Sequence, residues 1–474
     1  MRVLIRARAI ITMRGPGLGI IEYGGVYIED GLITCVGRYG EVIKHASKDD
    51  YYLNLSRSGV VMPAFYDMHM HTELNLLKGF ANDMPESQWM ELGVSPLASM
   101  MEWRHVKAST MLAITEALKT GTVVYGEYSR HLERQIDEIY KPIGLKVFGT
   151  FLFNALVEPM HEVSGKLYPL DAELGFKALD ETDRLIKKYR GDDKIRILYG
   201  PQAMDMVPLE VVRDAFVRAG ENSTYVHMHV AQGARERRQM MRRYGLSTVD
   251  LMLREGLLNN MLFAAHLHDT TENELRRVAE RMVKMVACYR SISSIDGVVP
   301  PLTKFMGYGG RAVVGTDNAV GPGNQSILKE LGYIALLSKV YEGDPTEMPP
   351  WTLLRIPTVE SSRVTRAFGN GVIEEGYKGD IMVLDLWRPN TLPILSKPIR
   401  NYPANIVYSI LGSEVTHVFI DGVPYVEDGV VKVFNEMEVL EEAQKAAEDL
   451  IEKGGEQYID TWNYLVERCR SGLF

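Results

Sequence analysis

The stretch Pro63-Ala64-Phe65-Tyr66-Asp67-Met68-His69-Met70-His71-Thr72-Glu73 decides how the rest of the chain is interpreted. It follows the apolar pair Val60-Val61 and is typical of a β-strand. Because strand side chains alternate between two faces, His69 and His71 project to the same side. Two imidazoles at this spacing can hold one metal ion, since a ring nitrogen of each reaches a common point about 2 Å away. The alternative is a pair of histidines at an exposed strand end.

Two later strand-like runs also carry alternate histidines. His227 and His229 lie in one run, and His266 and His268 lie in the next. A carboxylate, Asp317, follows a further apolar run. A single histidine or aspartate at a strand end is more often satisfied by local hydrogen bonds, but three strands with paired histidines and one carboxylate together favour a shared metal site.

Composition restricts the function classes. The chain has 474 residues, of which 46% are hydrophobic and 24% charged, as in a soluble globular protein with more than one ordinary domain. The net charge of −9, without a long run of Lys or Arg, gives no footprint for nucleic acid or for an anionic membrane surface, so we expect a small-molecule partner. No apolar run approaches the ~20 residues that span a bilayer, and the N-terminus lacks a signal-peptide core, which favours a cytoplasmic protein.

The three cysteines are widely separated and show neither pairing nor zinc-type spacing. This pattern is typical of reduced thiols in a cytosolic chain, and we assign no chemistry to Cys35, Cys288 or Cys469.

The middle of the chain, residues 61–367, alternates short apolar runs with amphipathic helical stretches. Such alternation over roughly 250 to 300 residues predicts a (β/α)₈ TIM-type barrel, an α/β fold whose active site lies at the carboxyl ends of the strands. Eight runs are predicted as its strands: Val61 to His71, Thr122 to Tyr128, Leu145 to Thr150, Ile195 to Gly200, Thr224 to Val230, Leu262 to His266, Lys284 to Cys288 and Ala312 to Gly315.

Both ends of the chain have a different pattern. Residues 1–60 and 368–434 contain short strand-like runs, the first set expected as a small antiparallel sheet and the second including Ile406 to Ser409. We expect the two segments to form one discontinuous β-sandwich domain. Residues 435–474 predict a C-terminal helical segment that Gly454-Gly455 breaks.

With these residues in place, the sequence resembles the amidohydrolase superfamily, in its branch of cytosine, guanine and adenosine-type deaminases and triazine chlorohydrolases. The resemblance covers nearly the whole chain and rests on an ordered set of motifs: Met62-Pro63-Ala64-Phe65, Asp67 with the His-x-His, Leu76-Leu77-Lys78-Gly79, His229-Val230-Ala231, Ala265-His266, Gly315-Thr316-Asp317 and Gly371 to Ile381. It implies a barrel flanked by a small β-sandwich, and homo-oligomers occur among such relatives.

The resemblance also implies a site and a reaction. One divalent ion, zinc or iron, would be held by four residues: His69, His71, His229 and Asp317. His266 would lie beside the metal-bound water. Binuclear relatives usually carry a carboxylated lysine on an interior strand, whereas the corresponding strand here ends in Gly200-Pro201-Gln202, so we expect a single metal. Metal-bound hydroxide would attack an N-heterocycle, and Asp317 would carry the proton as an amino, alkylamino or halide group leaves.

The chain departs from the family at the substrate-activating residues. Where relatives continue His-x-Ala-Glu, this sequence has Gln232, an amide that cannot gain or lose a proton near neutral pH. Gln202 stands where many deaminases have a histidine, and Cys288-Tyr289-Arg290-Ser291 replaces a segment with histidine and asparagine. Three interpretations remain open: Gln232 orients the substrate and Asp317 acts alone, Glu73 takes over the proton transfer, or catalysis is lost or altered.

Substrate contacts are predicted from position. Trp89 follows the metal strand and could stack on a planar ring, while Gln202 and Asp205 stand at strand-end positions that could face substrate. A cyclic amidase with two metals is the alternative enzyme. The sequence leaves open the substrate, the leaving group, the choice between zinc and iron, and the oligomeric state.

Overall fold

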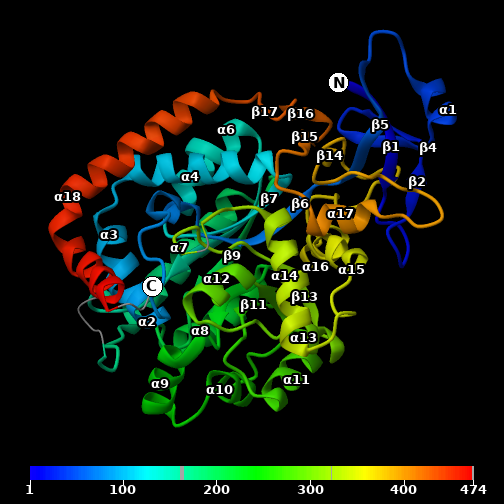
Figure 1. Cartoon of the computed structure of the whole chain (residues 1–474). Helices are drawn as coiled ribbons and strands as arrows, with labels where there is room; N and C mark the ends of the chain where they lie inside the picture. Colours follow the sequence, from blue (N-terminus) through cyan, green and yellow to red (C-terminus); the bar gives the residue numbers. More distant parts are fainter. Residues whose placement is uncertain (161–164, 322, 472–474) are drawn as a thin grey trace.

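Eight parallel strands form a barrel in chain order at the centre of the molecule (Figure 1). The computed structural model describes residues 1–160, 165–321 and 323–471. The barrel strands are β6 (Phe65–Met70), β7 (Thr122–Ser129), β8 (Lys146–Phe153), β9 (Ile195–Pro201), β10 (Val226–Val230), β11 (Leu262–His266), β12 (Lys284–Ala287) and β13 (Arg311–Val314). The predicted (β/α)₈ barrel is confirmed, and each of the eight predicted runs overlaps one barrel strand.

The barrel closes where its first and last strands meet. The peptide nitrogen of Asp317 donates to the carbonyl oxygen of His69 at 2.7 Å, and that of His71 donates to the carbonyl oxygen of Asp317 at 3.0 Å. These bonds form a parallel bridge between Met70 and Asp317. Closure of the barrel therefore brings the predicted metal strand beside the predicted metal-binding carboxylate.

Helices surround the strands, because the apolar side of each helix packs on the outside of the barrel. The longer ones are α4 (Trp103–Lys119), α7 (Ala172–Lys188), α8 (Leu209–Glu221), α9 (Gly233–Tyr244), α11 (Glu272–Glu280) and α14 (Ile327–Glu342). The shorter ones are α5 (Leu132–Gln135), α6 (Lys141–Ile143), α10 (Thr248–Arg254), α12 (Tyr289–Ile295), α13 (Leu302–Gly307), α15 (Pro350–Arg355) and α16 (Ser361–Thr365). Between β6 and α4 the chain forms η2 (Thr72–Leu77), α2 (Glu86–Gln88), η3 (Trp89–Val94) and α3 (Ser95–Met100).

The two ends of the chain share one mixed sheet, as expected for a discontinuous unit (Figure 1). Its strands are β1 (Arg2–Ile11), β2 (Ile20–Glu22), β3 (Gly24–Glu29), β4 (Leu32–Arg38), β5 (Tyr51–Pro63), β14 (Ile381–Asp385), β15 (Val415–Ile420), β16 (Val423–Glu427) and β17 (Val430–Val431). Their order is β17-β16-β15-β14-β5-β1-β3-β4, with β2 beside β1, so the strands from both ends of the chain belong to one hydrogen-bonded sheet.

Two details of this sheet differ from the prediction. The N-terminal strands are not all antiparallel, since β1 pairs in parallel with β5. The run predicted as one barrel strand from Val61 also divides, because Val61 pairs with Val383 and Pro63 with Ile381 in the terminal sheet. The barrel strand β6 begins only at Phe65. A residue between the two strands, Ala64, thus separates the two sheets.

The predicted strand at Ile406 to Ser409 is wrong, because these residues belong largely to the helix α17 (Tyr402–Tyr408). Pro403 lies in its first turn, where a proline has no hydrogen bond to lose and its fixed φ favours a helix. Ile406 and Val407 are buried, which produces an apolar run that resembles a strand.

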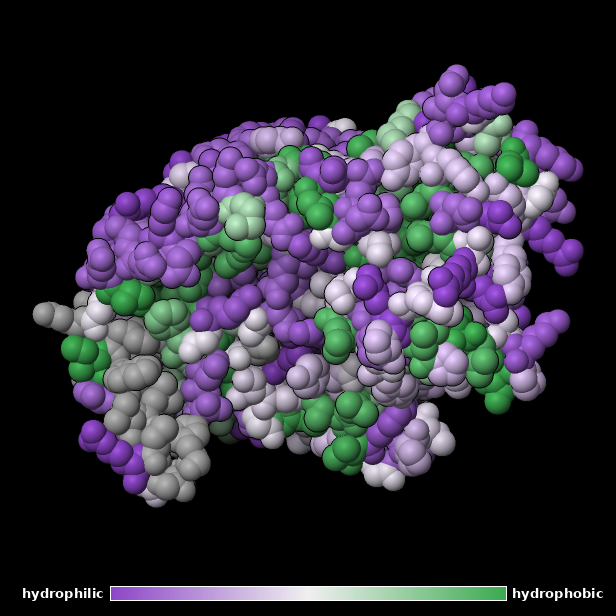
Figure 2. Space-filling model, turned by 45° about the horizontal axis from the view of Figure 1, so that its top comes forward, coloured by the Kyte–Doolittle hydropathy of each residue, from purple (hydrophilic) through white to green (hydrophobic). Residues whose placement is uncertain are grey.

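The C-terminal helix α18 (Glu436–Arg470) is continuous, so the predicted break at Gly454-Gly455 is wrong. It packs along α3 and α4, and the surface over this part of the molecule is largely hydrophilic (Figure 2). A Cβ on Gly454 would lie 2.9 Å from Leu97, so this glycine permits close packing rather than ending the helix. Asp449 accepts hydrogen bonds from Arg104 and from His105, which fasten the helix to α4.

Candidate metal centre and active site

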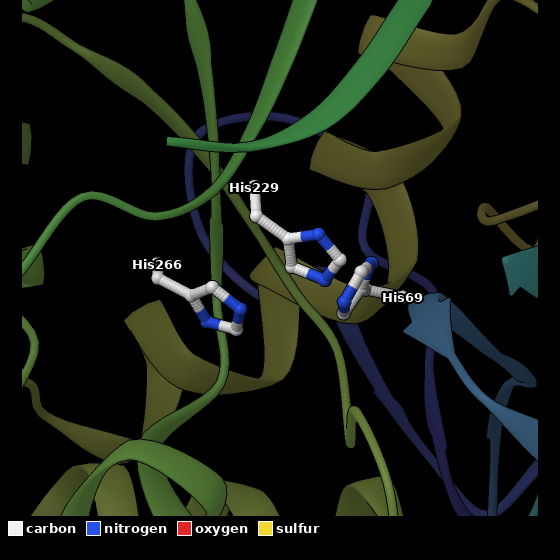
Figure 3. Close-up of side chains that lie close together, drawn as sticks. All are labelled: His69, His229 and His266. Carbon is white, nitrogen blue, oxygen red and sulfur yellow. The ribbon is translucent and has the colours of Figure 1, made fainter. Parts of the chain in front are cut away.

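Four histidines and one aspartate meet at the carboxyl ends of the barrel strands. They come from β6 and the residue that follows it, from β10 and β11, and from the segment after β13: His69, His71, His229, His266 and Asp317. All five are buried. Potential ligand atoms of His69, His229 and His266 lie within 4.8 Å of one another, as do those of His69, His71 and Asp317. Figure 3 shows the imidazoles of His69, His229 and His266 close together.

Distances within the cluster fit a shared ligand. The Oδ1 atom of Asp317 lies 3.5 Å from Nε2 of His71 and 3.7 Å from Nε2 of His69. The ring centroid of His69 is 4.9 Å from that of His71 and 5.0 Å from that of His229. The structure therefore brings together all four residues that the sequence predicts as metal ligands, with His266 beside them.

Hydrogen bonds to Nδ1 fix the orientation of two imidazoles, those of His229 and His69. Nδ1 of His229 lies 2.8 Å from the carbonyl oxygen of Gln202, so Nδ1 carries the proton and Nε2 keeps its lone pair. Nδ1 of His69 lies 3.0 Å from Nε2 of His227, whose Nδ1 is 3.0 Å from Oγ1 of Thr150. His227 is thus a positioning residue outside the cluster, a role that its place on the same strand face as His229 could have suggested.

Burial keeps the imidazoles neutral. It lowers the pKa of His71 and of His229 to about 4, and it lowers the pKa of His69 and of His266 well below the usual range. Nε2 of His69 and both ring nitrogens of His266 have no hydrogen-bond partner among the described residues. A buried polar atom without a partner costs about 1–3 kcal/mol, which ligation of a cation would relieve. The donor set therefore fits a divalent metal ion.

The two carboxylate oxygens of Asp317 have different surroundings. Its Oδ2 accepts a hydrogen bond from Oγ of Ser291 at 2.5 Å, while Oδ1 faces the histidines. Burial raises the pKa of the Asp317 carboxyl. Asp317 and His266 both have left-handed backbone angles, with φ of 64° and 79°, a conformation that is uncommon outside glycine and concentrated at functional sites. Nothing in the sequence pattern marks Ser291 as its partner.

A cavity of about 490 Å³ opens beside the cluster, within the usual range for a small-molecule site. His71, His229 and Asp317 line one part of it. The other predicted residues on its wall are Glu73, Trp89, Gln202 and Gln232. Apolar side chains complete the wall, among them Met90, Val94, Leu152 and Leu156.

Asp205 is the predicted substrate residue that the structure places elsewhere. It is fully buried, does not line the cavity and forms an ion pair with Arg235. Arg235 also pairs with Glu86 at 2.8 Å, three residues before Trp89. The prediction for Asp205 is therefore corrected: because its carboxylate neutralises a buried guanidinium, it supports the segment that carries Trp89 rather than facing substrate.

Glu73 lies in the cavity wall beside His71. Its carboxylate accepts a hydrogen bond from Ser129, and burial raises its pKa. Behind it, Glu127 accepts hydrogen bonds from Oγ1 of Thr72 and from the hydroxyl of Tyr140, each at 2.5 Å. Glu127 thus fixes the residue between His71 and Glu73, a role that its place inside an apolar strand does not reveal.

Gln202 and its neighbours form the polar part of the wall. Oε1 of Gln202 accepts from Nδ2 of Asn154 at 2.8 Å and from Arg130 at 3.4 Å. Gln232 follows β10, and its peptide nitrogen donates to Glu236 at 2.7 Å, which leaves the side chain on the cavity wall. Arg130 and Asn154 are wall residues that the sequence analysis missed, because no motif marks them.

None of the helices in the described part of the chain is long and apolar enough to cross a membrane.

Comparisons with known proteins agree with this architecture. The chain is 27% identical to a 5'-deoxyadenosine deaminase of Methanosarcina acetivorans over 453 residues, which is 95% of this chain and 98% of the relative. It is 28% identical to a 5-methylthioadenosine/S-adenosylhomocysteine deaminase of Desulforamulus reducens, covering 95% of this chain and 100% of the relative.

Solved structures share the fold. An adenosine deaminase from Xanthomonas campestris with bound zinc superposes with a TM-score of 0.85 at 22% identity, over 94% of this chain and 98% of the other. Atrazine chlorohydrolase from Arthrobacter aurescens in complex with zinc superposes with a TM-score of 0.81 at 16% identity, over 94% and 100%. Residues 60–424 match the Amidohydrolase family. The chain therefore belongs to the Amidohydrolase family and is a hydrolase that acts on carbon–nitrogen bonds.

Proposed function

We propose that this protein is a metal-dependent aminohydrolase that removes the amino group of an aminopurine nucleoside, such as an adenosine altered at its 5' position. The observation that carries the proposal is the set of metal-type donors on the wall of a cavity of about 490 Å³. The names of the relatives, which are deaminases of 5'-deoxyadenosine and of methylthioadenosine, supply the substrate class. An alkylamino or halide leaving group on another N-heterocycle is the nearest variation of the same chemistry.

Four residues would hold one catalytic ion: His69, His71, His229 and Asp317. Zinc is proposed because neutral imidazoles with one carboxylate suit it and because two proteins of this fold bind it. The same donors would also accept iron. When bound, such an ion would lower the pKa of water towards about 7 and so supply a nucleophile at neutral pH.

We also propose that the protein is cytoplasmic.

Asp317 would move the proton. Its Oδ2 is held by Ser291, and its Oδ1 lies 3.5 Å from Nε2 of His71, so Oδ1 faces the donors of the ion and would accept the proton that the attacking water loses. The carboxyl would then return that proton to the departing amine. His266 is neutral, so it can donate a single N–H to the oxygen that adds to the ring.

Glu73 would protonate the ring nitrogen, a step that Gln232 cannot perform because an amide does not titrate near neutral pH. Burial raises the pKa of Glu73, so its carboxyl keeps a proton at a higher pH than an exposed glutamate does. Gln232 shares the cavity wall and could hold the heterocycle through its amide N–H. Glu73 therefore supports an active enzyme in spite of Gln232.

Trp89 and Gln202 would position the substrate. The indole of Trp89 lies on the cavity wall and could stack on a planar ring. The carboxamide of Gln202 is oriented by Asn154, which leaves its NH₂ group to donate to a substrate acceptor.

The proposal is tested by ammonia release. Metal-free protein loaded with one equivalent of zinc is incubated with 5'-deoxyadenosine, 5'-methylthioadenosine, adenosine, guanine and aminotriazines, and ammonia, alkylamine and chloride are measured. We expect ammonia from at least one adenosine derivative and none from the metal-free protein. Release of no product across the panel would contradict the proposal and favour the second candidate, a metal-binding relative without turnover, to which Gln232 points.

A further inference from the structure

A second set of metal-type donors adjoins the first and shares His266 and Asp317 with it. Cys288 directly follows β12, and β12 lies between β11, which ends in His266, and β13, which leads to Asp317. The candidate ligand atoms of Cys288, His266 and Asp317 all lie within 4.8 Å of one another. All three residues are buried, with at most 3% of their surface exposed. The strand order therefore places a thiol beside the active-site acid.

Two of the three donors have little or no engagement elsewhere, whereas Asp317 also accepts a hydrogen bond from Ser291. Both ring nitrogens of His266 lack a hydrogen-bond partner among the described residues, although the side chain is fully buried. The sulfur of Cys288 has only a long contact, 3.9 Å to the carbonyl oxygen of Val286, which is a weak interaction. A buried imidazole with two unpartnered nitrogens marks a place where a ligand is missing.

We propose that Cys288, His266 and Asp317 form a second cation position, adjacent to the catalytic one and selective for thiophilic divalent ions such as zinc, cobalt or cadmium. A set of one sulfur, one nitrogen and one oxygen donor suits these ions and not magnesium or calcium. Asp317 would be shared between the two positions. The inference rests on the proposed function in two respects: Asp317 also binds the catalytic ion there, and His266 donates one N–H there, so its other ring nitrogen would bind the second ion. It differs from a lysine-bridged pair of metals, for which Gly200-Pro201-Gln202 offers no lysine.

Cobalt provides the test, because Co²⁺ bound to a thiolate gives a sulfur-to-cobalt charge-transfer absorption in the near ultraviolet that histidine and carboxylate ligands do not give. Metal-free protein is titrated with Co²⁺, and bound metal per chain is measured by elemental analysis. We expect two cobalt ions per chain in the unaltered protein and a charge-transfer band that develops with the titration. Cys288→Ser should bind one ion and lose the band completely.

The matched control removes the other two thiols. The variant with Cys35→Ser and Cys469→Ser keeps Cys288 as its only cysteine, and Cys35 lies in β4 of the terminal sheet, away from the barrel. This variant should keep both ions and the band, so the inference can be tested even where Cys288→Ser does not fold. One cobalt ion without a band in the unaltered protein, or a band that is absent from the control or survives Cys288→Ser, would overturn the inference.

Ammonia release separates this inference from the proposed function. Turnover with one equivalent of zinc, combined with the absence of a cobalt–sulfur band, refutes the second position and leaves the aminohydrolase intact. A band and two ions without turnover on any substrate of the panel supports the second position and refutes the proposed function.

Discussion

The metal cluster and the cavity wall around Gln232 are built in different ways. In the cluster, His69 is held through His227 and His229 through a carbonyl oxygen, so the donors are fixed before any ion binds. In the wall, Gln232 has an amide where the family's motif has a carboxyl, and a different acid, Glu73, faces the same cavity from η2, the short helix after β6. On the proposed function, the ion-binding geometry is kept while the group that activates the substrate lies on another element.

The largest effect is expected from Asp317→Asn, which removes the proton carrier and weakens the metal site. General acid–base catalysis typically contributes about 10²–10⁴-fold, so ammonia release should fall by at least 10²-fold when zinc is saturating. Asp428→Asn is a suitable control, because that side chain is 94% exposed in the terminal sheet. Unchanged ammonia release by Asp317→Asn would remove Asp317 from the mechanism.

Glu73→Gln sharpens the comparison, because it removes the only carboxyl that we assign to the ring nitrogen. We expect kcat to fall by about 10²-fold with zinc content unchanged. Glu158→Gln, which alters another glutamate of the cavity wall, should keep its kcat. Adding Gln232→Glu to Glu73→Gln should recover part of the activity, since it restores a carboxyl to the wall. Wild-type activity in Glu73→Gln would instead favour Asp317 acting alone.

His227→Phe tests the support behind the cluster. Loss of a residue that orients a metal ligand typically lowers metal affinity by about 10–100-fold, and we expect the Kd for zinc to rise by that factor. His417→Phe serves as the matched control, because His417 lies in β15 of the terminal sheet. Competition with a zinc-binding dye measures both values. An unaltered Kd in His227→Phe would show that His69 needs no support.

The smallest effect is on stability. Burial raises the pKa of Glu127 to about 8, whereas an exposed glutamate titrates near 4.5. Between these values the folded state holds a proton that the unfolded state has released, so the free energy of unfolding falls as the pH rises from 4.5 to 8. Glu127→Gln should flatten this decline in urea titrations of the metal-free protein, and the same slope in both proteins would contradict the assignment.

The sequence predicts the barrel because its signals are local. Each strand is a short apolar run, and the histidine pairs mark which strand ends meet. What it could not predict depends on contacts between distant segments. Asp205 forms an ion pair with Arg235 and so does not face the cavity. Gly454 lies in a continuous helix that packs on Leu97, and β1 pairs in parallel with β5.

The candidate site also contains residues that the sequence predicts and residues that it does not. The metal residues come from His-x-His motifs and strand-end positions that can be recognised in the chain itself. Ser291 donates a hydrogen bond to Asp317, and Glu127 accepts one from Thr72, the neighbour of His71. No motif marks either residue, so only the folded arrangement reveals their roles.

The most direct test is an anomalous difference map, measured at the zinc absorption edge from crystals of protein loaded with one equivalent of zinc. We predict one peak at about 2.0–2.2 Å from a nitrogen of His69, His71 and His229 and from an oxygen of Asp317. A peak that lies away from His229 or Asp317, or no peak at the barrel mouth, would contradict the account.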